Sequence, residues 1–263
     1  MPIQNYPKIV FVTGAGRGIG RAIALACAKA GSAVVCISKS DSCQRTSAEI
    51  ESQGGKASAM RLDIEDHVST ARAVSAAVAK VGHVRIGVVA AAAMLGPKGT
   101  LAAGNLSEWE RTFKVNVIGN LAVVQALLPV MTGVGFGRIV TLAGGGSGYA
   151  YPIFPAYAAS KVALVRAVEN LAKDLEGMGD IAVVCMAPGA IDTDMLAAVK
   201  AAGAEVRSKG DMAMVLGFID AFMTGRATAI TGRLVHVRDD YRPLLEGRAP
   251  PLADSHWKLR REE

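Results

Sequence analysis

The chain has 263 residues, a formal net charge of +6 and a hydrophobic fraction of 51%. This length allows two small domains or one α/β domain with a large core. The basic residues are dispersed and form no patch interleaved with aromatic residues, so we expect no nucleic-acid partner. No apolar run approaches the ~18 to 20 residues of a membrane span, so we expect no membrane association.

The cysteines and histidines give no sign of a metal site. Cys27, Cys36, Cys43 and Cys185 form no CxxC pair, and the four histidines have no ligand spacing. The first residues do not resemble a signal peptide, because the first apolar run ends directly in a glycine-rich loop. We therefore expect a cytoplasmic protein with small core cysteines and no metal.

Seven short apolar runs alternate with alanine-rich segments of helical periodicity. The runs cover residues 9–12, 33–37, 57–62, 84–89, 138–142, 181–186 and 230–237. Continuous Val/Ile runs are typical of parallel strands that are covered on both faces. Because no linker or internal repeat interrupts the alternation, the sequence predicts one doubly wound α/β domain over residues 1–263, with helices on both faces of a seven-stranded parallel sheet.

The loop TGAGRGIG at residues 13–20 follows the first predicted strand and opens a helix. This context indicates a Rossmann-type dinucleotide site, because glycines let backbone amides approach a pyrophosphate at the positive end of the helix. A purely structural glycine turn is the alternative. The predicted contacts are Gly14, Gly16, Arg17, Gly18, Ile19 and Gly20.

The second predicted strand ends in Ser38-Lys39-Ser40, where an NAD-selective site usually has a carboxylate for the ribose 2′-hydroxyl. Lys39 and Arg17 can together neutralise a 2′-phosphate, so we predict NADP(H) in preference to NAD(H). A solvated Lys39 is the alternative, and the nearby Asp41 leaves NAD open.

Tyr157 and Lys161 lie four residues apart in a predicted helix and share a face. A cation near a tyrosine favours the phenolate, so we expect a pKa below the ordinary value of about 10. Such a tyrosine can exchange a proton with a hydroxyl or carbonyl group. The alternative is an exposed aromatic residue beside an unrelated lysine.

With these motifs in order, nearly the whole chain resembles the classical short-chain dehydrogenase/reductase family. The loop at 13–20 looks like the family's TGxxxGxG, and Tyr157 and Lys161 match its YxxxK pair. By resemblance, Asp63 and Ile64 contact the adenine, and Asn116 links the lysine to a proton-relay water. The segment PGAIDT at 188–193 resembles the family's nicotinamide loop, which implies cofactor contacts at Pro188, Gly189, Ile191 and Thr193.

Two departures from the family pattern concern the site. The family's NNAG is replaced by an alanine run that includes Ala90 and Ala91, which can contact the cofactor only through backbone or methyl groups, so we expect a looser loop. The family's substrate-orienting serine corresponds to Gly144. Ser147, in a glycine-rich stretch, is a candidate substitute, and the alternative is that no substitute exists.

The resemblance implies hydride transfer between NADP(H) and a carbonyl or secondary alcohol, with Tyr157 as general acid/base. A non-catalytic cofactor-binding protein is one alternative, and an epimerase or dehydratase is another. We expect a substrate lid at about 192–226 and a C-terminal tail at 240–263, whose basic cluster at 258–261 is solvated. We also expect self-association as a dimer or homotetramer through helices at about 107–131 and 156–175. The apolar faces of these helices carry Leu121, Val124, Leu128, Leu164, Val168 and Leu171.

Overall fold

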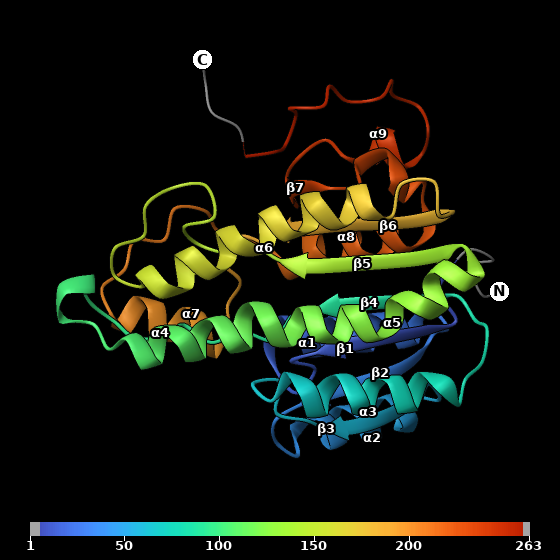
Figure 1. The fold of residues 1–263 in the computed structure, drawn as a ribbon, viewed down its shortest axis with the longest axis horizontal. Coiled ribbons are helices and arrows are strands. Elements are labelled where there is room, and N and C mark those ends of the chain that lie inside the picture. Colours follow the sequence, from blue (N-terminus) through green and yellow to red (C-terminus); the bar gives the residue numbers. More distant parts are fainter. Residues whose placement is uncertain (1–5, 260–263) are drawn as a thin grey trace.

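A seven-stranded parallel sheet forms the centre of the molecule in the computed structural model, which describes residues 6–259 (Figure 1). The strands are β1 (Ile9–Thr13), β2 (Ala33–Ser38), β3 (Lys56–Arg61), β4 (Ile86–Ala90), β5 (Phe136–Leu142), β6 (Asp180–Ala187) and β7 (Arg233–His236). They lie in the order β3-β2-β1-β4-β5-β6-β7, and every neighbouring pair is parallel. The predicted fold class is confirmed.

Helices cover both faces of the sheet, and each face has its own apolar cluster. One face carries α1 (Gly18–Lys29), α2 (Ser42–Ser52), α8 (Met212–Thr224) and α9 (Arg242–Leu245). The other carries α3 (His67–Ala79), α5 (Asn120–Val134) and α6 (Pro155–Asp174). Because the β1/β4 pair lies where the strand order reverses, the carboxyl ends of these strands form the crevice in which such sheets bind ligands.

The remaining elements lie mainly at that end of the sheet, toward which the strand arrows point in Figure 1. They are η1 (Leu101–Ala103), α4 (Leu106–Phe113), the π-helical turn η2 (Lys114–Gly119) and α7 (Asp194–Ala201). A further short helix, η3 (Ala227–Ile230), precedes β7.

The last strand is shorter than predicted. Residues 227–230 form η3, and Gly232 has a left-handed φ of 71° before β7 begins at Arg233. An extended strand cannot pass through this conformation, so the predicted start at Ile230 is wrong.

The predicted lid is also shorter, because α8 belongs to the core. Val215, Phe218 and Phe222 are completely buried and pack in the same cluster as α1. Only the part from Asp192 to Ser208 borders the large cavity described below. The stretch from 209 to 226 therefore does not form a lid.

The helices predicted to self-associate use much of their apolar surface inside the subunit. Val124, Leu164 and Val168 are at most 2% exposed, so they are core residues and cannot contact another subunit in this fold. Leu121, Leu128 and Leu171 are half-buried. The exposed apolar side chains of this region are instead Leu106, Ile118 and Val162.

The continuous helical segment Leu106–Val134 is long and apolar enough to cross a membrane by length and composition. Core helices of globular proteins pass the same test, and α5 packs against α3, β4 and β5. The segment is thus weak evidence for a membrane span.

Candidate active site

The glycine loop between β1 and α1 is shaped by close backbone contacts. A Cβ on Gly14, whose φ is 66°, would lie 2.9 Å from Ala92 Cα, and a Cβ on Gly20 would lie 2.4 Å from the Gly14 carbonyl oxygen. These contacts are closer than real Cβ atoms show, so the packing requires glycine. The loop leaves the amino end of α1 open to a cavity, as a pyrophosphate site requires.

This cavity has a volume of about 1360 Å³ and brings together most of the predicted site residues. Its lining contains all the predicted cofactor contacts except Ala90: Gly14, Gly16, Arg17, Gly18, Ile19, Gly20, Ser38, Lys39, Asp63, Ile64, Ala91, Tyr157, Lys161, Pro188, Gly189, Ile191 and Thr193. Ser147 also lines it. Ala90 ends β4 inside the sheet and Asn116 is fully buried, so neither faces the cavity. The glycine-loop residues and polar side chains that line this cavity therefore fit a dinucleotide.

Tyr157 and Lys161 lie on the first two turns of α6, which begins with Pro155 at a position favourable for proline. Both side chains are buried, and Lys161 Nζ lies 5.4 Å from the centroid of the Tyr157 ring. The Lys161 ammonium donates a hydrogen bond to the Leu142 carbonyl at 2.8 Å. The pair thus lies between the cavity and the end of β5.

Burial sets the protonation of this pair. It raises the pKa of Tyr157 well above its ordinary value and lowers the pKa of Lys161 to about 8. The expected lowering of the tyrosine pKa is therefore wrong for the protein without cofactor, because burial, and to a smaller extent the Tyr151 and Tyr149 phenols, raises this pKa. At neutral pH the phenol is protonated and can donate its proton.

Asn116 lies on the π-helical turn η2, and its buried side chain forms hydrogen bonds with two other segments of the chain. Its amide accepts from Met94 N at 2.8 Å and donates to Met94 O and to Ser160 Oγ, both at 2.9 Å. Ser160 Oγ in turn donates to the Tyr157 carbonyl at 2.7 Å. Asn116 thus links the loop after β4 to the helix that carries Tyr157.

Asn120 is a second buried asparagine that the sequence analysis missed. Its side chain accepts from Thr13 Oγ1 at 2.7 Å and donates to the Ala92 carbonyl at 2.8 Å, while Ala92 N donates to Thr13 Oγ1 at 3.0 Å. The alanine loop is therefore braced by Asn116, Asn120 and Thr13, and the predicted looseness is wrong. The signal in the sequence was a polar residue on the buried face of an apolar helix.

Gly144 lies directly against the catalytic tyrosine candidate. A Cβ on Gly144 would lie 2.3 Å from Tyr157 Oη, so the phenol occupies the space that a serine side chain would need. Ser147 is buried, and its hydroxyl accepts from Gly144 N at 3.0 Å and donates to Gly144 O at 2.8 Å. Ser147 thus stabilises the loop through both polar atoms of Gly144, and a role for its hydroxyl on substrate stays a prediction.

The end of β2 and the start of α2 form a polar corner of the cavity. Lys39 Nζ lies 2.6 Å from Asp63 Oδ2, and Arg17 Nη1 lies 3.1 Å from Asp194 Oδ2; all four side chains are well exposed. The Lys39 ammonium helps to lower the pKa of Asp63, which partial burial opposes. Ser42 and Arg45 also line this corner and were not predicted.

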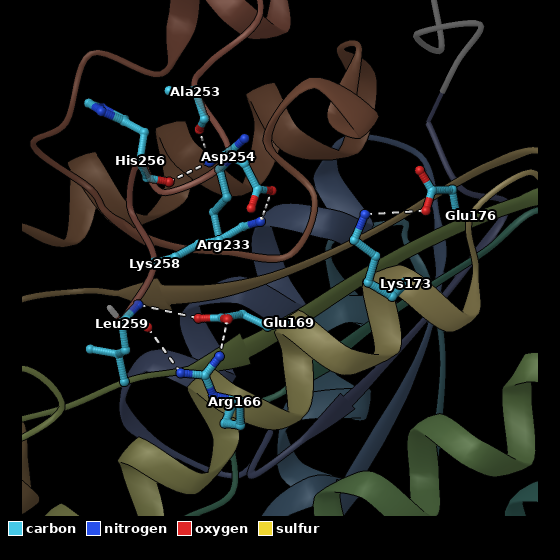
Figure 2. A network of polar contacts seen from close by, with 10 residues as sticks. All are labelled: Arg166, Glu169, Lys173, Glu176, Arg233, Ala253, Asp254, His256, Lys258 and Leu259. Atoms are coloured by element: carbon cyan, nitrogen blue, oxygen red, sulfur yellow. Dashed lines mark hydrogen bonds and ion pairs between the residues drawn. The ribbon is translucent and has the colours of Figure 1, made fainter. Parts of the chain in front are cut away.

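The C-terminal segment reaches the cavity, contrary to the expectation of a solvated tail. Figure 2 shows Leu259 held by α6: its carbonyl accepts from Arg166 at 3.0 Å, and its N–H donates to Glu169 at 3.3 Å. The Lys258 side chain is only 10% exposed and pairs with Asp254 at 2.6 Å. Residues 257–259 line the cavity, while 260–263 lie outside the described residues.

Comparisons with known proteins agree with this geometry. The short chain dehydrogenase family model matches residues 8–203. The 7α-hydroxysteroid dehydrogenase of Escherichia coli K12 is 35% identical over 193 residues, which cover 73% of this chain and 74% of that protein. A short chain dehydrogenase of Pseudocercospora fijiensis is 34% identical over 194 residues, 73% of this chain, and the matched part spans only 62% of that relative.

Solved structures share the fold over most of their length. A proposed NAD(P)-dependent gluconate 5-dehydrogenase of Beutenbergia cavernae, with NADP bound at low occupancy, has a TM-score of 0.80 and 29% identity, covering 92% of this chain and 99% of its own. A 7α-hydroxysteroid dehydrogenase complexed with NADH and 7-oxo glycochenodeoxycholic acid has a TM-score of 0.78 and 29% identity, with coverages of 89% and 94%. Sequence, fold and site geometry agree: this chain belongs to the short-chain dehydrogenase/reductase family of oxidoreductases, which act on alcohol and carbonyl groups.

Proposed function

We propose that this protein transfers a hydride between NADP(H) and a carbonyl compound or secondary alcohol, with Tyr157 as the proton donor and acceptor. The observation that carries the proposal is the buried Tyr157/Lys161 pair, placed in the wall of a cavity that begins at the glycine loop. Burying two polar groups is costly, and proton exchange gives the Tyr157 phenol a use that cofactor binding alone would not require.

The chain's own residues supply binding, orientation and the proton. The nicotinamide cofactor, when bound, supplies or accepts the hydride. The glycine loop and the positive end of α1 would hold its pyrophosphate, and Asp63 and Ile64, which line the same cavity, would contact its adenine end as the family resemblance implies. The protonated Tyr157 Oη then donates to the substrate oxygen as negative charge develops there.

Lys161 has two effects in this arrangement. Its ammonium is fixed by the Leu142 carbonyl, beside the tyrosine ring. A positive charge at this place stabilises the phenolate left after proton donation, and so lowers the energy of the step. Asn116 and Ser160 hold the backbone of Tyr157 in position for it.

The preference for NADP(H) rests on the corner between β2 and α2. Lys39, Arg45 and the hydroxyls of Ser38, Ser40 and Ser42 gather there around the cavity. Arginine, lysine and hydroxyl groups are suitable partners for a 2′-phosphate. The relatives do not decide the matter, because one neighbouring structure holds NADP and another holds NADH.

Parallel fluorescence titrations with NADPH and NADH test the cofactor part of the proposal. We expect NADPH to bind at least tenfold more tightly, which corresponds to about 1.4 kcal/mol. Lys39→Glu should remove most of this difference by weakening NADPH binding, since it places a carboxylate beside the 2′-phosphate. An equal effect of Lys39→Glu on both cofactors would refute the assignment.

Turnover tests the chemical part. NADPH oxidation is followed with acetophenone, cyclohexanone, ethyl acetoacetate and 9,10-phenanthrenequinone as carbonyl probes. Tyr157→Phe should bind NADPH normally and lose more than about 100-fold in kcat, because the donor for the substrate oxygen is gone. Cofactor binding without reduction of any probe would favour the non-catalytic alternative.

A further inference from the structure

The glycines at 144–146 allow two tyrosines to pack onto one loop. A Cβ on Gly144 would meet Tyr157 Oη at 2.3 Å, and a Cβ on Gly145 would meet Cε1 and Cζ of Tyr151 at 3.4 Å. A Cβ on Gly146 would lie 2.9 Å from Tyr151 Cβ. The phenol ends of Tyr157 and Tyr151 therefore lie against adjacent residues of the same loop.

Tyr151 is held in this place by the same small cluster that holds Tyr157. The cluster contains Phe154, Tyr157 and Val199, and Tyr151 packs against it with its ring 6.2 Å from that of Phe154. Both tyrosines line the large cavity. Tyr151 thus presents a positioned hydroxyl beside the proton donor.

The Tyr151 hydroxyl is available as a donor. Within residues 6–259, no protein group forms a hydrogen bond with it. Burial raises the pKa of Tyr151, so its proton is retained at neutral pH. By contrast, the Ser147 hydroxyl already donates a hydrogen bond to the Gly144 carbonyl and accepts one from Gly144 N.

Tyr149 is the other phenol nearby and is less suited to this role. It is 37% exposed, and the Arg207 guanidinium carbon lies over its ring, 4.3 Å from the ring centroid. Its ring meets Tyr151 edge to face at 6.2 Å. The Tyr149 hydroxyl also lies 3.5 Å from the Cβ position of Gly145, so both phenols border this part of the loop, and Tyr149 is the more exposed of the two.

We propose that the Tyr151 hydroxyl is the second hydrogen-bond donor to the substrate's reacting oxygen, the position left without a serine at Gly144. The inference rests on the proposed function and assigns no proton loss to Tyr151. Tyr157 gives up its proton to the oxygen, and Tyr151 keeps its own while its O–H dipole stabilises the charge that develops.

Three matched variants test the assignment with the four carbonyl probes named above. Tyr151→Phe removes only the hydroxyl and keeps the ring contacts with Phe154. We expect kcat to fall about 100-fold, the usual order for loss of one such donor, with KM within threefold and the NADPH Kd within twofold of the wild type. Tyr149→Phe is the matched control and should stay within threefold in kcat.

The third variant, Ser147→Ala, addresses the competing donor. Because Ser147 stabilises the loop, we expect a lower melting temperature and a loss in kcat well below that of Tyr151→Phe. If Tyr151→Phe retains kcat within threefold, or if Ser147→Ala alone gives the 100-fold loss, Tyr151 is not the donor. A wild type that binds NADPH and reduces none of the probes overturns the proposed function, and the inference with it.

Discussion

At the scale of single residues, burial decides the chemistry of the site more than neighbouring charge does. Tyr157 and Lys161 could be identified from their spacing together with the glycine loop and the other motifs of the chain, because a helix brings residues four apart to one face. Their protonation states could not be predicted from the sequence, because the loss of solvation around each group depends on the packing of α6 against β5. The same applies to Gly144, whose contact with Tyr157 Oη appears only in three dimensions.

The lowered pKa of Lys161 leads to a prediction about stability. The folded pKa is about 8 and the unfolded value 10.5, so the unfolded chain binds more protons between these pH values. The burial penalty is therefore complete below pH 8 and relieved as the pH rises toward 10.5. Relative to Lys161→Met, which never pays this penalty, the wild type should gain roughly 3 kcal/mol between pH 7 and pH 10.5.

Urea unfolding of both proteins without cofactor, at several pH values, measures this gain. The difference between the two proteins is the relevant quantity, because tyrosines and cysteines that do not interact with Lys161 titrate equally in both. Cys185 is an exception, since the Lys161 ammonium acts to lower its pKa against the effect of burial. The Leu142 carbonyl loses its partner in Lys161→Met, which shifts the difference by an amount independent of pH. A difference that does not change with pH would show that Lys161 is charged throughout.

At the scale of elements, the strands could be predicted closely and the connections could not. The seven apolar runs correspond to the seven strands. In the inner strands β1, β4, β5 and β6 the pattern is clear because residues such as Val and Ile are covered on both faces, whereas the edge strand β3 has no β-branched residue and is largely exposed. The π-helical turn η2 and the 3₁₀ turn before β7 left no such pattern. In η2, Gly119 packs so closely that a Cβ would lie 2.1 Å from the Ile64 carbonyl oxygen, a contact set by the tertiary fold.

Asn120 connects three elements, so its loss should reach the cofactor site. Asn120→Ala leaves the Ala92 carbonyl without this donor in a buried region and frees Thr13. We expect a loss of about 2 kcal/mol in unfolding free energy and at least fivefold weaker NADPH binding, because Ala92 also packs against Gly14 of the glycine loop. Chemical denaturation and fluorescence titration measure the two effects.

The matched control is Asn105→Ala. Asn105 is exposed and its side chain accepts from Ser107 N at the start of α4, away from the glycine loop. Asn105→Ala should lower the unfolding free energy by about 1 kcal/mol, the usual effect of losing a helix cap, and leave NADPH binding unchanged. Unchanged NADPH affinity in Asn120→Ala as well would mean that the asparagine serves stability alone.

At the scale of the whole molecule, the C-terminal segment shows what a local pattern cannot reveal. Its basic composition indicated a solvated tail. In the structure, Leu234 N donates to the Trp257 carbonyl at 2.8 Å, so the segment lies beside β7 at the edge of the sheet. Figure 2 shows a neighbouring contact, in which Arg233 Nη1 donates to the Ala253 carbonyl at 3.1 Å. Through these contacts, residues at the C-terminal end of the chain become part of the cavity wall. The contacts need β7 in its place at the edge of the sheet, so the local sequence does not reveal them.

Self-association is the remaining question at this scale. We propose a homotetramer, with one contact formed by the exposed apolar side chains around α4, η2 and α6. Leu106 is 69% exposed, Ile118 43% and Val162 36%, and both α4 and η2 pack against α6, so the three lie on neighbouring elements. Subunit contacts bury apolar side chains that are exposed in the single subunit, which motivates the choice of these three positions.

The double variant Ile118→Asp/Val162→Asp tests this contact. Both side chains are solvent-accessible in the single subunit, so the carboxylates should cost the fold little, whereas burying them unpaired in an interface is unfavourable. We expect the mass measured by light scattering to fall at least twofold. Val68→Asp, at a 59% exposed position on α3, is the control and should leave the mass unchanged. If the double variant keeps the wild-type mass, subunits associate through another surface; a monomeric wild type would refute the tetramer itself.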